Sequence, residues 1–245
     1  AVKRLGNLDS LSREFANEYS ERLWKQLVLA PGTGGPASAS RRDATLAIVL
    51  AFAAGIALKL PELFGRHMGD NGDEQFYVRN ISLFVLPFLA AFFALKRGLH
   101  TAGWLWLVLP FLAGALIMNL MPFAPEGHTM VLSVIHLPIA IWLTIGFAYA
   151  GGQWRNHEQR MNFVRFSGEW FIYFVLIALG GGALTGITLF IFNAIGLNVE
   201  SLAQQWLVPC GAAGAVIIAS WLVEHKQSVI ENMAPVLTRL FTPLF

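Results

Sequence analysis

Charged side chains are scarce in this 245-residue sequence. Asp, Glu, Lys and Arg make up 13% of it, whereas about 25% is usual in soluble globular proteins. Apolar residues make up 56% before the 23 glycines are counted, which is more apolar surface than a folded chain of this length can hide from water. The composition therefore argues against an ordinary soluble domain and predicts a protein whose solvent is lipid.

Cysteine is almost missing as well. A single cysteine excludes a disulfide or a cysteine-based zinc site within the chain. The sequence also lacks a Walker phosphate loop and the HExxH and GxSxG motifs. Ser133 and His136 lie three residues apart, but the GxS motif of six-span intramembrane serine proteases is missing. We expect no enzyme activity, no cofactor and no resident metal, and the formal net charge of +2 indicates no nucleic-acid partner.

Long apolar runs are what the sequence does contain. Each approaches the roughly 20 residues that cross about 30 Å of hydrocarbon at about 1.5 Å per residue. Helices satisfy every backbone group in lipid, so the predicted fold is an all-α integral membrane protein whose transmembrane domain covers residues 44–223. The six predicted spans are 44–60, 77–95, 102–124, 130–151, 170–194 and 202–223.

Basic residues are distributed unevenly around these six runs. The N-terminal segment, the loops after the second and fourth runs and the C-terminal tail together hold 14 of the 17 Lys and Arg residues. Because basic loops stay in the cytoplasm during insertion, we expect both termini to be cytoplasmic. The first apolar run begins only near residue 44, so the first span is predicted to be its own insertion signal.

The segments outside the six runs are predicted from their periodicity. Residues 1–30 read as a cytoplasmic amphipathic helix that lies on the membrane, docks on cytoplasmic loops or binds a protein partner. Residues 31–43 read as a flexible linker. Residues 224–245 read as an amphipathic interfacial helix interrupted by Pro235. The start at Ala1 and the apolar ending LFTPLF leave two interpretations open, a piece of a longer chain and a natural end.

Glycines are concentrated in the fifth run. Gly180, Gly181, Gly182 and Gly186 are predicted either to let a neighbouring helix approach closely or to form a hinge. Ala51 with Gly55, and Gly211 with Ala215, repeat the small-x-x-x-small spacing that favours close helix packing.

A few polar residues lie inside the apolar runs, and most fall in the half away from the predicted cytoplasmic side. Polar side chains in lipid are costly and are functional candidates for that reason. Asn119 and His136 are at matching depths on consecutive runs, so we expect them to form a hydrogen bond. The hypothesis is a polar vestibule that opens outward; the alternative is that these side chains only hold helices together. The candidate lining residues are Asn119, Ser133, His136, Asn193 and Gln204.

Three segments carry a resemblance to a known family. The basic loop RNHEQRMNFVRF, the last apolar run and the tail ENMAPVLTRLFTPLF resemble bacterial multi-spanning membrane proteins of domain-of-unknown-function family forty-one fifty-three, over roughly the last hundred residues. The resemblance implies a bacterial inner membrane and a chain that continues beyond Phe245. It implies no functional residue, because the family has no agreed activity.

Two functions follow as hypotheses from the sequence. The first is a permease-like, transport-related inner-membrane protein that uses the polar vestibule. The second is a non-catalytic membrane subunit or scaffold that anchors or regulates a partner complex through its N-terminal helix and its C-terminal amphipathic segment. The expected partners are the lipid bilayer and, in the second case, another protein.

Overall fold

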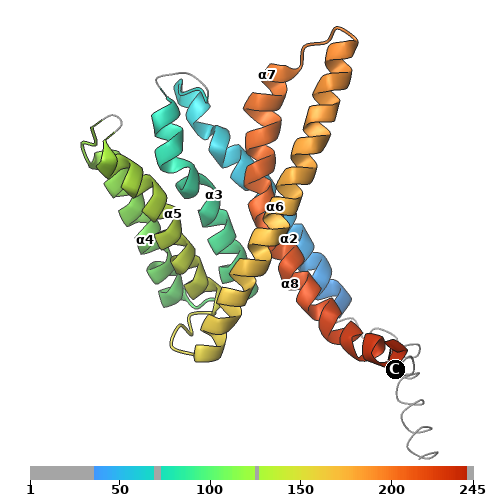
Figure 1. Ribbon diagram of the computed structural model, residues 1–245. Coiled ribbons are helices and arrows are strands. Elements are labelled where there is room, and N and C mark those ends of the chain that lie inside the picture. The colour runs from blue at the N-terminus through green and yellow to red at the C-terminus, as the bar shows by residue number, and fades with distance from the viewer. Residues whose placement is uncertain (1–35, 69–72, 125–126, 242–245) are drawn as a thin grey trace, which may run out of the picture. The chain divides into compact units, whose positions relative to one another are not determined.

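Six long apolar helices make up most of the chain. The computed structural model describes residues 36–68, 73–124 and 127–241, with side chains described for 41–68, 73–124 and 127–225. Within these ranges the secondary structure is entirely helical, and six helices are long and apolar enough to cross a membrane (Figure 1). The prediction of six helices of spanning length is confirmed. The amphipathic helix expected in residues 1–30 lies outside the described residues.

The first long helix begins earlier than the sequence predicts. Helix α2 runs over Pro36–Lys59 and continues into a 3₁₀ turn, η2, at Leu60–Phe64. The linker prediction for residues 31–43 is therefore wrong for residues 36–43, which are helical. Proline is tolerated at the first helical position, where its missing N–H costs nothing, and the following Ala, Ser and Arg residues contain no helix breaker.

Helices α3 (Glu74–Lys96), α4 (Thr101–Leu120) and α5 (His128–Tyr149) pack pairwise against one another (Figure 1). Gly114 sits at the α4–α5 contact, where an added Cβ would lie 2.7 Å from Leu137 Cδ1. A side chain at this position would force the Leu137 side chain to shift, so glycine allows the close α4–α5 contact seen here. The α3–α4 turn contains Gly98 at a φ of 63°, a conformation that glycine adopts without strain.

Helix α6 spans His157–Ala194 and begins well before the predicted span. Asn156 caps it, accepting a hydrogen bond from the Glu158 backbone N–H at 2.9 Å. Because this N-cap stabilises a helix start at His157, most of the basic loop is the first part of α6. The α6 helix remains unbroken through Gly180, Gly181 and Gly182.

The last helix starts with an irregular turn. Helix α7 (Glu200–Leu202) leads into a π-helical turn, η3 (Ala203–Leu207), and then into α8 (Val208–Phe241). Pro209 lies two residues after the π turn, and a wider turn relieves the clash between a proline ring and the carbonyl four residues earlier. The predicted separate interfacial helix in 224–245 is corrected: residues up to Phe241 continue α8, through Pro235.

Helices α2, α6 and α8 form the second group of contacts. Gly55 on α2 faces Cys210 on α8, where an added Cβ would lie 3.3 Å from the Cys210 Cβ. Gly214 faces Ala51 in the same way at 3.6 Å. The predicted role of Ala51 and Gly55 in close packing is confirmed, with Cys210 and Gly214 as the residues that meet them on α8.

Aromatic rings join α3, α5 and α6. The ring centroid of Phe93 lies 5.2 Å from those of both Tyr149 and Phe166, and Tyr149 stacks on Phe166 at 4.9 Å. This cluster lies where α3 and α5 end and α6 begins. We call that end of the bundle, which carries Lys96, Arg97 and Arg155, the basic end, and the other the opposite end.

Candidate functional site

The predicted vestibule residues lie on four different elements. Asn119 on α4 does not pair with His136 but with Asn80 on α3: its Nδ2 donates to Asn80 Oδ1 at 2.8 Å, and its Oδ1 accepts from Asn80 Nδ2 at 3.2 Å. Asn119 Nδ2 also donates to the Ala115 carbonyl at 2.9 Å. Asn80 is 4% exposed and Asn119 is exposed, so this reciprocal pair is a partly buried polar contact between α3 and α4.

The other four candidates stay on their own helices. His136 is exposed on α5, with Nδ1 2.7 Å from the Leu132 carbonyl oxygen, and Ser133 is half-buried one turn before it. Gln204 Nε2 donates to Glu200 Oε1 at 2.9 Å, and Asn193 is exposed near the end of α6. None of the five lines either of the two pockets described below.

The four candidate glycines of α6 face open space. An added Cβ at Gly180, Gly181, Gly182 or Gly186 would meet no atom within 4 Å among the described residues. No residue in the most apolar 18-residue window of α6 is buried. These glycines therefore do not serve contacts within the described part of the chain.

A large apolar cleft lies between α2, α6 and α8 in the half toward the opposite end, and we call it the α2–α6–α8 cleft. Its volume is about 1090 Å³. Small residues of α2 and α8 form one wall and larger side chains of α6 form the other. Residues that define it include Gly55, Ile56, Leu189, Phe192, Gly211 and Ile218.

A charged pair marks the end of this cleft. Lys59 is 7% exposed, and its Nζ lies 2.5 Å from Glu62 Oε1. The same ammonium lies 4.8 Å from the centroid of the Trp206 ring. Trp206 belongs to the π turn, so the irregular start of the last helix brings an aromatic face against the cation. The pair offers one positive and one negative group beside an apolar cavity.

The remaining polar groups of the cleft are occupied by backbone contacts. Thr185 and Thr188 donate their hydroxyl hydrogens to the carbonyls of Gly181 and Leu184, each at 2.8 Å. The thiol of Cys210 donates to the Gly55 carbonyl at 3.6 Å. The middle of the cleft therefore presents carbon surface, and Lys59 and Glu62 are its polar groups.

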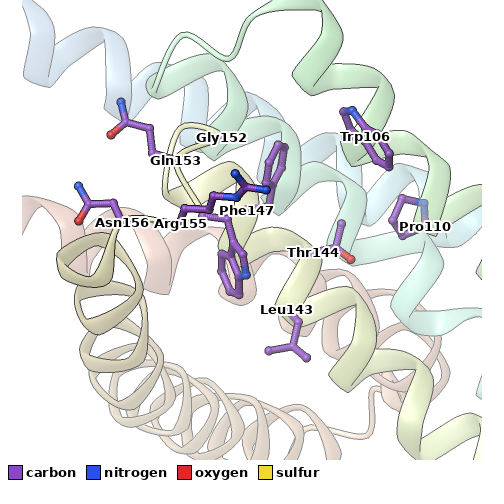
Figure 2. A pocket seen from close by; sticks show the side chains of 10 residues that line it. Trp106, Pro110, Leu143, Thr144, Phe147, Gly152, Gln153, Arg155 and Asn156 are labelled. Carbon is purple, nitrogen blue, oxygen red and sulfur yellow. The ribbon is translucent and has the colours of Figure 1, made fainter.

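A second pocket, the basic-end pocket, lies beside α4 and α5 (Figure 2). Its volume is about 780 Å³. Trp106 and Pro110 of α4 and Leu143 and Phe147 of α5 form an apolar floor, and the α5–α6 connection forms a polar rim. The rim residues are Gly152, Gln153, Trp154, Arg155 and Asn156.

The rim of the basic-end pocket is held by backbone hydrogen bonds. Gly152 N–H donates to the Phe147 carbonyl at 3.0 Å, and Gln153 N–H donates to the Ala150 carbonyl at 3.1 Å. Gly151 and Gly152 adopt φ values of 60° and 83°, which a side chain would strain. The two glycines thus end α5 in a turn that carries Arg155 back toward the pocket.

Ion pairs tie the basic end together. Glu224 of α8 has a 6% exposed side chain, and its carboxylate lies 2.9 Å from Lys96 Nζ and 3.1 Å from Arg97 Nη2. Lys96 also reaches Asp43 at 3.4 Å. The cluster joins α2, α3 and α8, and Arg97 stacks over the Tyr149 ring at 5.0 Å.

The functional features that sequence reasoning missed are contacts between distant segments. From the sequence alone, Lys59 and Arg155 contribute only to the count of basic residues that sets the orientation, and nothing singles out Trp206 as a partner of Lys59. Lys59 and Trp206 are 147 residues apart in the sequence, and Arg97 and Glu224 are 127 residues apart. Contacts over such separations produce no local sequence pattern from which they could be predicted. Lys59 and Glu62 at three residues' spacing were the single available signal for the charged pair.

Comparison with known proteins identifies no relative. No family model matches the chain, and no curated protein and no solved structure is significantly similar to it. The resemblance drawn from the loop and tail therefore stays a prediction. No cluster of three metal-ligating side chains occurs among the residues that the structure describes.

Proposed function

We propose that this chain is a multi-pass membrane protein with a permease-like role, and that its substrate is an amphiphile held in the α2–α6–α8 cleft. The observation that carries the proposal is the combination of a carbon-lined cavity of about 1090 Å³ with the Lys59–Glu62 pair at its end. An acyl chain fits the cavity, and a head with both charge signs complements the pair. A zwitterionic phospholipid such as phosphatidylethanolamine has that chemistry.

The proposed setting follows the distribution of basic residues. The basic end faces the cytoplasm, both termini are cytoplasmic, and the membrane is the bacterial inner membrane that the family resemblance implies. The cleft then opens in the outer half of the bilayer. The polar vestibule of the sequence hypothesis is replaced in this proposal by an apolar cleft, because the five candidate residues line neither pocket.

The test uses two matched glycine substitutions. Gly211 lines the cleft and Gly186 lies on α6 outside it, and an added Cβ meets no neighbour at either position. Gly211→Leu should narrow the cleft and reduce photolabelling by a phosphatidylethanolamine with a photoreactive acyl chain several-fold, whereas Gly186→Leu should label like the wild type. Equal labelling of all three proteins would rule out the cleft as the binding site.

Transport is measured separately in reconstituted vesicles. A fluorescent phosphatidylethanolamine should exchange between leaflets faster with the wild-type protein than in empty vesicles, and Gly211→Leu should slow that exchange. If Gly211→Leu reduces labelling but the wild-type protein does not speed lipid exchange, the cleft is a lipid-binding site and the permease-like role is contradicted.

The alternative is a non-catalytic membrane subunit, and the exposed half of α6 favours it. Four open glycines on an unburied apolar helix are the surface that a transmembrane helix of a partner protein would use. Here Gly186→Leu should release a co-purifying partner and Gly211→Leu should not. The same two variants thus distinguish the two functions by opposite outcomes.

A further inference from the structure

We propose that the basic-end pocket is a binding site for an anionic phospholipid, with the headgroup phosphate on Arg155 and an acyl chain over the floor of Trp106, Pro110 and Phe147. The site lies on α4, α5 and the α5–α6 connection. It shares no residue with the α2–α6–α8 cleft, so it is independent of the function proposed above.

The charge of the pocket is unbalanced. Arg155 is the charged residue among those that line it, and no carboxylate is among them. Two other arginines of this end form ion pairs: Arg97 with Glu224 at 3.1 Å and Arg165 with Glu169 at 3.2 Å. Within the residues that the structure describes, Arg155 makes no hydrogen bond or ion pair, so its guanidinium is available to an anion.

The position of Arg155 suits a phosphate next to an apolar surface. In Figure 2 its side chain extends toward Phe147, while the amide ends of Gln153 and Asn156 point away from that side. A planar guanidinium can donate two parallel hydrogen bonds to phosphate oxygens. The Asn156 oxygen already caps α6, so Arg155 is the rim donor that lies next to the apolar floor.

The floor of the pocket explains why the ligand is a lipid and not free phosphate. Trp106 is 67% exposed, and Pro110, Leu143 and Phe147 continue the apolar surface beside it. Thr144 already donates its hydroxyl hydrogen to the Ala140 carbonyl at 3.0 Å. The floor therefore gains from covering by a hydrocarbon chain and offers little to a small polar anion.

The depth of the pocket matches the boundary between headgroups and hydrocarbon. Trp106 lies five residues after the first residue of α4, or roughly 7.5 Å along the helix at about 1.5 Å per residue. Tryptophan favours this interfacial level. In the orientation proposed above, this end is cytoplasmic, and basic pockets between helices on the cytoplasmic side are typical sites for anionic headgroups. Arg155 at the rim and Trp106 on the floor thus span one interface.

Native mass spectrometry of the full chain in neutral detergent, titrated with phosphatidylglycerol, tests this site. Arg155→Gln should weaken binding about tenfold, the usual effect of losing a hydrogen bond to a charged group, and Arg155→Lys should recover part of it. Arg165→Gln, the same change at an exposed position of the same end, should bind like the wild type. Equal binding by the wild type and Arg155→Gln would overturn the proposal.

Two further arms fix the nature of the ligand and the independence of the site. Glycerol 3-phosphate at the lipid's concentration should fail to displace phosphatidylglycerol; displacement would overturn the assignment to a lipid. Gly211→Leu should leave the affinity for phosphatidylglycerol unchanged, and a matching loss there would overturn the separation of this site from the cleft.

Discussion

The amide pair of Asn80 and Asn119 shows how single residues fasten helices in an apolar environment. Each side chain donates to the other, and Asn80 also donates to the Phe76 carbonyl at 3.0 Å. An apolar replacement of one partner leaves a buried amide oxygen unsatisfied, which costs more than the contact itself contributes.

Asn119→Leu should therefore lower the free energy of unfolding by about 1–2 kcal/mol. The double variant Asn80→Leu with Asn119→Leu should recover part of that loss, because no amide is then stranded. Thermal unfolding in detergent measures both. Asn193→Leu is the matched control, since Asn193 is exposed like Asn119 but is not paired with a buried amide among the described residues, and a loss as large for this variant would contradict the argument.

Glu224 is the second residue on which stability depends. Glu224→Gln removes the carboxylate that faces Lys96 and Arg97 and leaves two cations close together at the basic end. We expect a loss of about 1–3 kcal/mol, below the value for a fully buried pair because Arg97 is 36% exposed. Glu169→Gln, which breaks an exposed one-turn pair, should change the unfolding midpoint very little; equal effects would show that burial of Glu224 is unimportant.

Individual contacts were the hardest features to predict from the sequence. Asn119 and His136 were paired because their depths match, but depth does not determine which way a side chain points around the helix axis. Each residue turns the direction by about 100°, so a small rotation of α4 selects Asn80 on α3 instead. Asn80 lies near the start of its helix. A polar residue is common at a helix end, so the sequence did not indicate that Asn80 is buried and pairs with Asn119.

Elements were predicted more reliably than contacts. A run of about 20 apolar residues is a strong signal because hydrocarbon thickness sets its length, and all six runs became helices. The ends moved where polar sequence continues a helix without a breaker, as in residues 36–43 and in the basic loop before 170. The π turn at Ala203–Leu207 depends on Pro209, whose position alone does not determine how a helix adapts.

Helix α6 supports a prediction at this scale. Replacing Gly180, Gly181, Gly182 and Gly186 with Ala should stabilise the purified protein, because glycine costs about 0.5–1 kcal/mol relative to alanine in a helix and each added methyl meets open space. The measurement is the thermal midpoint of the quadruple variant. A lower midpoint would show that these glycines are packed against another helix or another copy of the chain.

At the scale of the whole molecule, the two pockets differ in both place and charge. The α2–α6–α8 cleft ends in a paired cation and carboxylate, whereas the basic-end pocket has an arginine without a carboxylate. The proposed ligands follow from that difference, a zwitterionic lipid in one and an anionic lipid in the other. In the proposed orientation, the two sites face opposite leaflets.

That orientation is tested by cysteine labelling in intact cells. Cys210 is the single cysteine, so Cys210→Ala gives a background without thiols. Cysteine at Asn198, near the opposite end, should react with a membrane-impermeant maleimide in intact cells, whereas cysteine at Gln153, on the basic-end rim, should react only after permeabilisation. Both positions are exposed, so access across the membrane and not burial decides the result. The reverse pattern would place the basic end outside, contrary to the basic-residue rule, and would exchange the leaflets of the two proposed lipid sites.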